Sequence, residues 1–156
     1  MDRKVEFGFS SFEVLVSIAI LLILSYIGTK QFAQYKASRD LMRQANMLED
    51  ELAWIKSISP TQDVSYGIVI SSGSYTIFKD KDADCKFTSN DDIVRIVPFI
   101  TGIVASSNTT TIITFDRRGQ PRDQSCGLGI ASITLQGTNN NTITLDVSKY
   151  GRLRIK

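Results

Sequence analysis

The sequence predicts an α+β fold in which one long N-terminal helix spans a membrane with its first half and packs on an antiparallel β-sheet head with its second half. Two observations lead to this prediction. Residues 7–29 form an apolar run with a single charge, Glu13, and the first proline of the chain is Pro60. After Pro60 the apolar residues change from a helical spacing to the period of two that is typical of strands.

The apolar run is long enough to cross a bilayer. A helix over residues 7–29 is about 35 Å long, and the hydrocarbon core of a bilayer is about 30 Å thick. A secretory signal peptide needs a small-residue cleavage site after its apolar core, whereas this run continues directly into a polar helical segment. Arg3 and Lys4 favour a cytoplasmic N-terminus, although the nearby acids Asp2 and Glu6 leave no net charge.

The polar continuation of the helix is amphipathic. Apolar residues recur at spacings of 4, 3, 4 and 3, at Leu41, Ala45, Leu48, Leu52 and Ile55. This spacing places them on one helical face, so we expect the sheet to cover this stripe. With no proline before Pro60, the predicted helix extends from Phe9 to about Ile58.

Short β-rich runs follow the helix and are separated by turn residues such as Ser72-Gly73 and Asn139-Asn140. The clearest alternation is that of Val64, Tyr66, Ile68 and Ile70. The other predicted strands are 74–78, 93–97, 110–115, 129–135, 142–147 and 152–155. Together these runs predict one antiparallel sheet.

The composition argues against an enzyme. The sequence contains no histidine, which excludes Ser-His and Cys-His nucleophile pairs and all histidine-based metal sites. The acidic residues cluster in one loop and one helix, and the sequence has no glycine-rich phosphate-binding loop. We therefore expect no catalytic residues, no cofactor and no small-molecule substrate.

The two cysteines, Cys85 and Cys126, allow two interpretations. An even number of cysteines in a domain outside the cytoplasm favours a disulfide. Closing a loop of about forty residues would contribute roughly 3–4 kcal/mol in the chain-entropy treatment. The alternative is a pair of unpaired buried thiols.

An acidic segment resembles a calcium-binding loop in its spacing. Asp80, Asp82 and Asp84 alternate, and Asp91 follows eleven residues after Asp80. However, Cys85 stands where an EF-hand needs glycine, and the twelfth position is an aspartate instead of the longer bidentate glutamate. A solvated acidic turn is the preferred interpretation, and a calcium site is the alternative.

The C-terminus is basic. The cations of the last ten residues are Lys149, Arg152, Arg154 and Lys156. In an extended strand Arg152, Arg154 and Lys156 point to one face, where they could contact phosphates, and Gly151 would let the backbone approach a ligand closely. The alternative is an edge strand that is charged to prevent aggregation.

The N-terminus resembles the prepilin signal of type IV pilins and type II secretion pseudopilins. The motif is G-F-S-S-F-E followed by about twenty apolar residues, with Gly8, Phe9 and Glu13 at the three positions that define it. The resemblance implies that a prepilin peptidase cleaves after Gly8 and methylates Phe9. A carboxylate in a membrane span is costly unless it is paired. Glu13 would therefore pair with the Phe9 amine of a neighbouring subunit during filament assembly, the alternative being a Glu13 solvated among the lipid headgroups.

Three further passages resemble the FimT/GspH family of minor pilins and pseudopilins. They are FKDKDADCKFTSNDDIVR, ITFDRRGQPRD and the C-terminal GRLRI. The family implies a pilin-like fold over the whole chain. The expected parts are a leader peptide at 1–8, a transmembrane and filament-core helix at 9–29, an amphipathic helix at 30–59 and a β-sheet head at 60–156.

The family also suggests a function. Gly151, Arg152 and Arg154 match the G-R-x-R motif with which FimT-type competence pilins bind DNA. The leading hypothesis is therefore a minor pilin of a type IV pilus-like filament that contacts DNA during natural transformation. The alternative is a GspH-type pseudopilin of a type II secretion system, which contacts proteins. Both place the chain in the inner membrane as a single-pass protein with its head outside the cytoplasm, and both imply other pilin subunits and a prepilin peptidase as partners.

Overall fold

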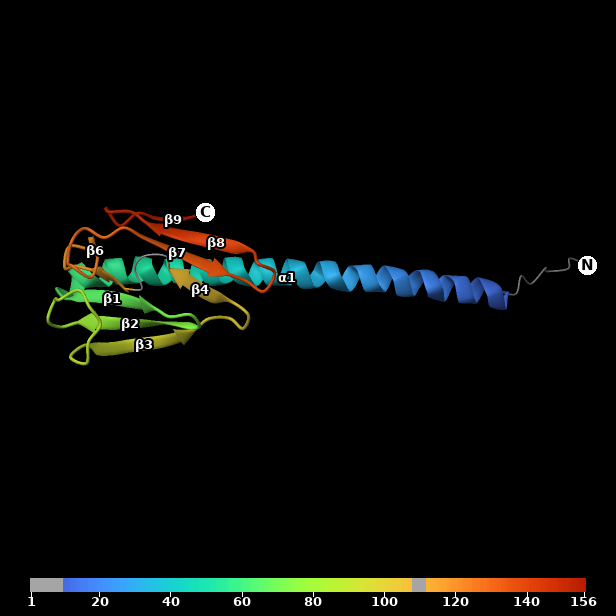
Figure 1. Ribbon diagram of the computed structural model, residues 1–156, viewed down its shortest axis with the longest axis horizontal. Coiled ribbons are helices and arrows are strands. Elements are labelled where there is room, and N and C mark those ends of the chain that lie inside the picture. The colour runs from blue at the N-terminus through green and yellow to red at the C-terminus, as the bar shows by residue number, and fades with distance from the viewer. Residues whose placement is uncertain (1–9, 108–111) are drawn as a thin grey trace, which may run out of the picture. The chain divides into compact units, whose positions relative to one another are not determined.

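The computed structural model describes residues 10–107 and 112–156. Its one long helix, α1, is Ser11–Gln62. The strands are β1 Ser65–Ile70, β2 Ser74–Asp80, β3 Asp92–Pro98, β4 Val104–Ser107, β5 Ile112–Phe115, β6 Pro121–Arg122, β7 Ala131–Gln136, β8 Thr142–Val147 and β9 Leu153–Ile155 (Figure 1). The chain divides into two compact units, of which the first ends at Lys36 and the second, the head, is Ala37–Lys156.

The first unit leaves its apolar side chains uncovered. From Phe12 to Leu24 the large apolar side chains of α1 are 42% to 75% exposed. Among the described residues, α1 is the one helix that is long and apolar enough to cross a membrane. This confirms the candidate membrane span at the level of length and composition.

The helix of the head ends later than the sequence predicts. The predicted helix stops before Pro60, whereas α1 continues to Gln62 and contains Pro60 in its last turn. Pro60 lacks the N–H that would donate to the Lys56 carbonyl, so it costs the last turn one helical hydrogen bond, and the helix ends two residues later. Asp63 then adopts a left-handed φ of 53°. The Val64 N–H donates to the Ser59 carbonyl at 3.2 Å, which closes the C-terminus of the helix.

The strands form two antiparallel sheets, so the prediction of one sheet is wrong. Sheet A has the order β3-β2-β1-β5-β6, and sheet B has the order β4-β7-β8-β9. Seven of these strands fall in the predicted runs, although residues 110 and 111 of one run lie outside the described residues. Strands β4 and β6 are new. They have four and two residues, which is too short for an alternation to be recognised.

The predicted stripe on the helix forms the core of the head. Leu41, Ala45, Leu48, Leu52 and Ile55 are at most 2% exposed. Inward side chains of both sheets pack in the same cluster, among them Ile68 and Ile77 of sheet A and Ile133 and Leu145 of sheet B. Both sheets therefore share the C-terminal part of α1 as their common support (Figure 1).

A smaller apolar contact lies on the opposite face of sheet A. Gly67 of β1 pairs with Phe78 of β2. A Cβ atom on Gly67 would lie 2.3 Å from Phe78 Cζ, so the ring occupies the space above this glycine. The ring of Phe87 packs on Phe78 with 5.0 Å between centroids. This contact anchors the acidic segment between β2 and β3 onto the sheet.

Candidate functional site

The structure brings three C-terminal cations together. In β9, Leu153 and Ile155 are half-buried against the core. Arg152, Arg154 and Lys156 are exposed on the opposite, outward side of sheet B. This is the alternation expected of an extended strand.

The three cations line a shallow groove of about 330 Å³ on the outward face of sheet B. Ser132 of β7, Asp146 of β8 and Arg154 of β9 lie side by side in the strand register and contribute to its floor. Ser148 also lines the groove. The groove therefore combines hydroxyl groups with three positive charges and one acid.

That acid is committed to one of the three cations. Asp146 Oδ2 lies 2.6 Å from Lys156 Nζ, and its Oδ1 accepts a hydrogen bond of 2.6 Å from the Ser132 hydroxyl. These two bonds, the one from Lys156 first, hold the pKa of Asp146 below its ordinary value. Arg152 and Arg154 form no ion pair with any described residue. They are the two uncompensated charges of the groove.

Gly151 has a structural role next to this groove. It adopts a φ of +69°, and its carbonyl accepts a hydrogen bond of 2.8 Å from Lys56 Nζ of α1. A Cβ atom at this position would lie 3.2 Å from the same Nζ. Any other residue would therefore strain the backbone and crowd this contact. Lys149 lies beside Tyr150, with its Nζ 4.9 Å from the ring centroid.

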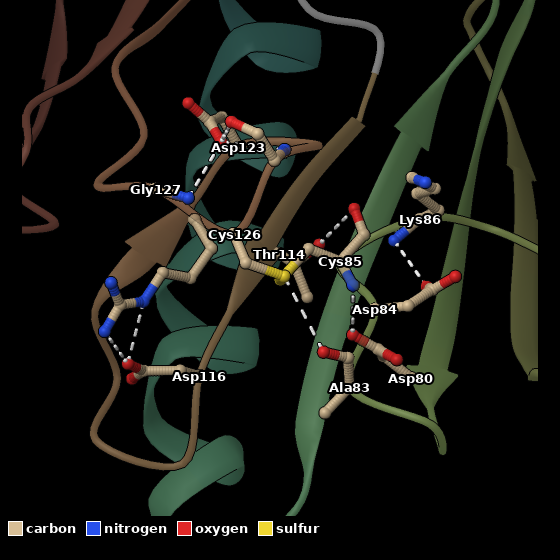
Figure 2. Close-up of a disulfide and its surroundings, with 12 residues drawn as sticks. Asp80, Ala83, Asp84, Cys85, Lys86, Thr114, Asp116, Asp123, Cys126 and Gly127 are labelled. Atoms are coloured by element: carbon tan, nitrogen blue, oxygen red, sulfur yellow. Dashed lines mark hydrogen bonds and ion pairs between the residues drawn. A yellow bond between two sulfur atoms is a disulfide. The ribbon is translucent and has the colours of Figure 1, made fainter.

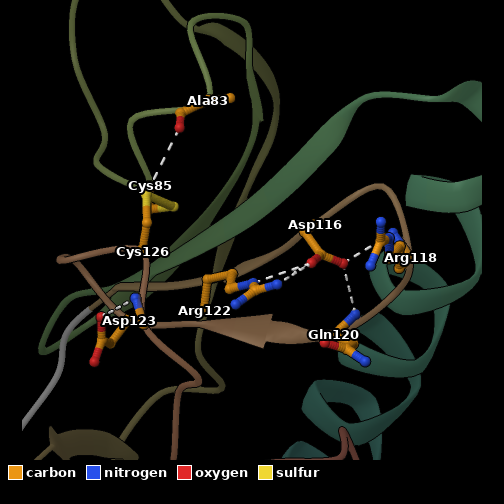
Figure 3. Close-up of polar contacts among 9 residues, drawn as sticks. Ala83, Cys85, Asp116, Arg118, Gln120, Arg122, Asp123 and Cys126 are labelled. Atoms are coloured by element: carbon orange, nitrogen blue, oxygen red, sulfur yellow. Dashed lines mark hydrogen bonds and ion pairs between the residues drawn. A yellow bond between two sulfur atoms is a disulfide. The ribbon is translucent and has the colours of Figure 1, made fainter.

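The turn between β5 and β6 is organised by Asp116 (Figure 3). Its Oδ1 accepts hydrogen bonds from the backbone amides of Arg118 and Gln120 at 2.8 and 2.9 Å. Its Oδ2 accepts from Nη2 and Nε of Arg122 at 2.7 and 3.0 Å. Burial raises the pKa of Asp116, but these hydrogen bonds outweigh burial, so the pKa lies below its ordinary value. Arg122 is thus committed to the turn.

Lys56 is a structural residue that the sequence does not reveal. Its ammonium group binds Gly151, and a Cβ atom on Gly119 would lie 3.0 Å from its backbone carbonyl. The helix and two glycine turns of the ITFDRRGQPRD and GRLRI passages therefore meet at one lysine. In the sequence, Lys56 lies off the apolar stripe and looks like an ordinary solvated charge.

The structure contains the disulfide between Cys85 and Cys126, which are separated by 41 positions (Figure 2). This confirms the predicted bond and excludes the alternative of unpaired thiols. The bond links the acidic segment after β2 to the segment that follows β6.

The acidic segment divides its carboxylates between two roles. Ligand oxygens of Asp80, Asp82 and Asp84 lie within 4.8 Å of one another. Burial, more than any other cause, raises the pKa of Asp80 to about 6. Asp91 instead closes the loop, because its carboxylate accepts hydrogen bonds from the Lys81 amide and from the amide and hydroxyl of Thr88. The structure thus brings together three of the four candidate calcium ligands.

Of the three residues of the prepilin-like signal, the structure describes only Glu13. Gly8 and Phe9 lie outside the described residues. Glu13 lies in the first turn of α1 with an exposed side chain, and the Ser17 hydroxyl donates to its carbonyl at 2.7 Å.

These features define a class: an α+β head on the C-terminal part of a helix whose N-terminal part is apolar and uncovered. Three solved structures are similar to about three quarters of this chain. No protein-family model and no characterised protein sequence matches the chain.

The type IV minor pilin FimU of Pseudomonas aeruginosa is similar with a TM-score of 0.60 and 14% identity, covering 78% of this chain and 92% of FimU. A second crystal form of FimU gives a TM-score of 0.57 and 15% identity, covering 74% and 92%. The minor pseudopilin EpsH of the Vibrio cholerae type 2 secretion system gives a TM-score of 0.57 and 10% identity, covering 75% and 96%. The chain therefore has the fold of minor pilins and minor pseudopilins, which confirms the pilin-like α+β fold expected from the sequence.

Proposed function

We propose that this protein is a minor subunit of a pilin-type filament, held in the inner membrane by the first part of α1 with its head outside the cytoplasm. The observation that carries the proposal is the apolar surface from Phe12 to Leu24, which the protein leaves uncovered. A bilayer would cover this surface before assembly, and the helices of neighbouring subunits would cover it in the filament. The Cys85–Cys126 disulfide supports an oxidising compartment for the head.

The N-terminal residues complete this proposal. A prepilin peptidase would remove residues 1–8 as a leader peptide and methylate Phe9, so that residues 9–29 become the filament core. Residues 30–59 and 60–156 would then be the helical and β-sheet parts of the exposed head. Glu13, four residues after Phe9, would bind the amine of Phe9 in the next subunit.

Glu13→Ala is expected to leave membrane insertion intact and to reduce filament incorporation at least tenfold. Removing the carboxylate relieves the cost of a charge in the membrane but also removes the partner of the Phe9 amine. The measurement is the ratio of protein in sheared filaments to protein in membranes. Asp50→Ala is the matched control, because it removes an exposed acid from the head part of the same helix. Incorporation of Glu13→Ala at the control level would refute the pairing.

We further propose that the outward face of sheet B binds the phosphates of DNA. Arg152 and Arg154 supply two uncompensated charges, and the Ser132 and Ser148 hydroxyls line the same groove. The single acid, Asp146, is already paired with Lys156. Contacts of this kind bind phosphates instead of base edges. The affinity would therefore be nearly independent of the DNA sequence and would fall with rising salt, as expected of a DNA-uptake pilin.

The double change Arg152→Gln, Arg154→Gln is expected to weaken DNA binding and to flatten its salt dependence. Affinity of the unaltered protein should lie near 10⁻⁴–10⁻⁶ M, roughly the non-specific range. Each lost phosphate contact reduces the slope of log affinity against log salt by about 0.9, so the slope should fall by up to about two units. Anisotropy of labelled duplex DNA, measured on the full chain in a non-ionic detergent, gives both quantities.

Lys81→Gln, Lys86→Gln is the matched control for this test. It removes two exposed positive charges from the acidic segment and changes the net charge by the same amount. If the control lost as much affinity as the arginine variant, binding would follow net charge and not the groove. Unchanged binding in the arginine variant would remove Arg152 and Arg154 from the interface.

A second candidate function is that of a pseudopilin that contacts proteins. The edge strand β3 favours it, because Ile93, Val94 and Ile96 are 54%, 43% and 60% exposed. Apolar side chains on an open strand edge are typical of surfaces that another chain covers. The likeness to EpsH fits this alternative as well as the likeness to FimU fits the first. Absence of DNA binding by the intact protein would leave this function in place.

A further inference from the structure

The acidic segment holds a buried carboxylate oxygen for which the described residues provide no partner. Asp80 is 1% exposed, and its Oδ2 accepts a hydrogen bond of 3.1 Å from the Cys85 amide. Its Oδ1 is buried and has no hydrogen-bond partner among the described residues. A buried acceptor of this kind is costly unless a hydrogen bond or a cation compensates it.

We propose that Asp80, Asp82 and Asp84 bind a calcium ion. One ligand oxygen of each residue lies within 4.8 Å of the other two, so the Asp80 carboxylate belongs to a cluster of like charges. Three carboxylates at this distance repel one another, and one divalent cation between them removes the repulsion and satisfies the buried oxygen. The proposal concerns the head alone and does not depend on the filament or DNA functions above.

The neighbouring basic side chain is directed elsewhere. Lys81 Nζ lies 2.7 Å from Asp92 Oδ1, so this ammonium group compensates an acid outside the cluster. Lys86 donates its backbone amide to Asp84 Oδ1 at 2.9 Å, which leaves Asp84 Oδ2 for a metal (Figure 2). Asp82 is exposed and can turn its carboxylate toward an ion from the solvent side.

The loop is held in place from both sides. Cys85 is tied to Cys126 by the disulfide, and Phe87 packs on Phe78 of sheet A. Asp91 closes the other end of the loop through the amides of Lys81 and Thr88. Because none of these contacts involves a metal ligand bond, binding would not have to order the whole segment, which lowers its entropic cost.

The donor set selects the kind of metal. All three ligands are carboxylate oxygens, which suit hard cations, and the two cysteines are consumed by the disulfide. Calcium accepts irregular sets of six to eight oxygen ligands and can complete its shell with backbone carbonyls and water. Magnesium requires a near-ideal octahedron and releases its water reluctantly, so it should bind more weakly. Three carboxylates at the end of β2 and in the loop after it correspond to the affinity of extracellular calcium modules, about 10⁻⁴–10⁻³ M.

The test uses the full chain in detergent, treated with a chelator and then titrated with CaCl₂ or MgCl₂. Calorimetry should give a calcium dissociation constant of about 10⁻⁴–10⁻³ M. Saturating calcium should raise the Tm of the head by roughly 5–10 °C. Magnesium should bind at least tenfold more weakly. If the unaltered protein shows neither binding heat nor a shift in Tm at about 10 mM CaCl₂, which is well above this range, the proposal is overturned.

Variants then locate the ion. Asp82→Asn removes an exposed ligand charge and should weaken calcium binding at least tenfold while leaving the metal-free Tm unchanged or higher, because it relieves repulsion. Asp92→Asn is the matched control, since Asp92 is an exposed acid at the start of β3 that lies outside the cluster. Equal losses in both variants, or equal responses to calcium and magnesium, would mean a diffuse acidic field and would overturn the site.

Discussion

Replacing Cys85 and Cys126 with serine is expected to lower the stability of the head by about 4 kcal/mol. The disulfide closes a loop of 41 positions, and for this length the chain-entropy treatment gives about 4 kcal/mol. For a head of this size the Tm should fall by about 15 °C. Trp54, the single tryptophan, reports the transition because it packs edge-on against Tyr66 in the head.

Reductant provides the matched control for this prediction. Dithiothreitol should lower the Tm of the unaltered protein toward that of the double serine variant and leave the variant itself unchanged. A variant within about 3 °C of the unaltered protein would show that the Phe78 and Phe87 contact and the Asp91 hydrogen bonds hold the loop without the bond.

Leu52→Ala is expected to destabilise the head by about 3 kcal/mol. Leu52 is fully buried in the stripe that both sheets cover, and removing a buried leucine side chain costs about 2–5 kcal/mol in lost burial and in the cavity left behind. Alanine is the better helix former, so the loss cannot come from helix propensity. Denaturant unfolding followed by Trp54 fluorescence measures it.

Met47→Ala is the matched control, because Met47 lies on the same stretch of α1 and is 38% exposed. It should change stability by less than about 1 kcal/mol. Similar effects of the two substitutions would mean that this face of the helix is not the main support of the sheets.

The parts of the fold that follow from local periodicity could be predicted from the sequence. The stripe from Leu41 to Ile55 and the alternation from Tyr66 to Ile70 each repeat often enough to identify both the element and its buried face. The disulfide could be predicted for a different reason, because a sequence with two cysteines allows only one intramolecular pairing.

The remaining features depend on contacts between distant parts of the chain. The division into two sheets depends on β4 pairing with β7 and on β5 pairing with β1, and no local pattern encodes either partner. Lys56 acquires its role only because two turns far along the chain meet it. The pairing of Lys156 with Asp146 likewise required the β8–β9 register, so three cations in the sequence become two free charges in the structure.

The two sheets are interleaved along the chain. Strands β1, β2 and β3 belong to sheet A, β4 to sheet B, β5 and β6 to sheet A, and β7, β8 and β9 to sheet B. Neither sheet can therefore be completed before the chain has crossed to the other. The β1–β5 and β4–β7 pairings each close a long loop, which slows folding. The same arrangement makes independent opening of one sheet unfavourable, so amide hydrogen exchange in the two sheets should report a single cooperative unit.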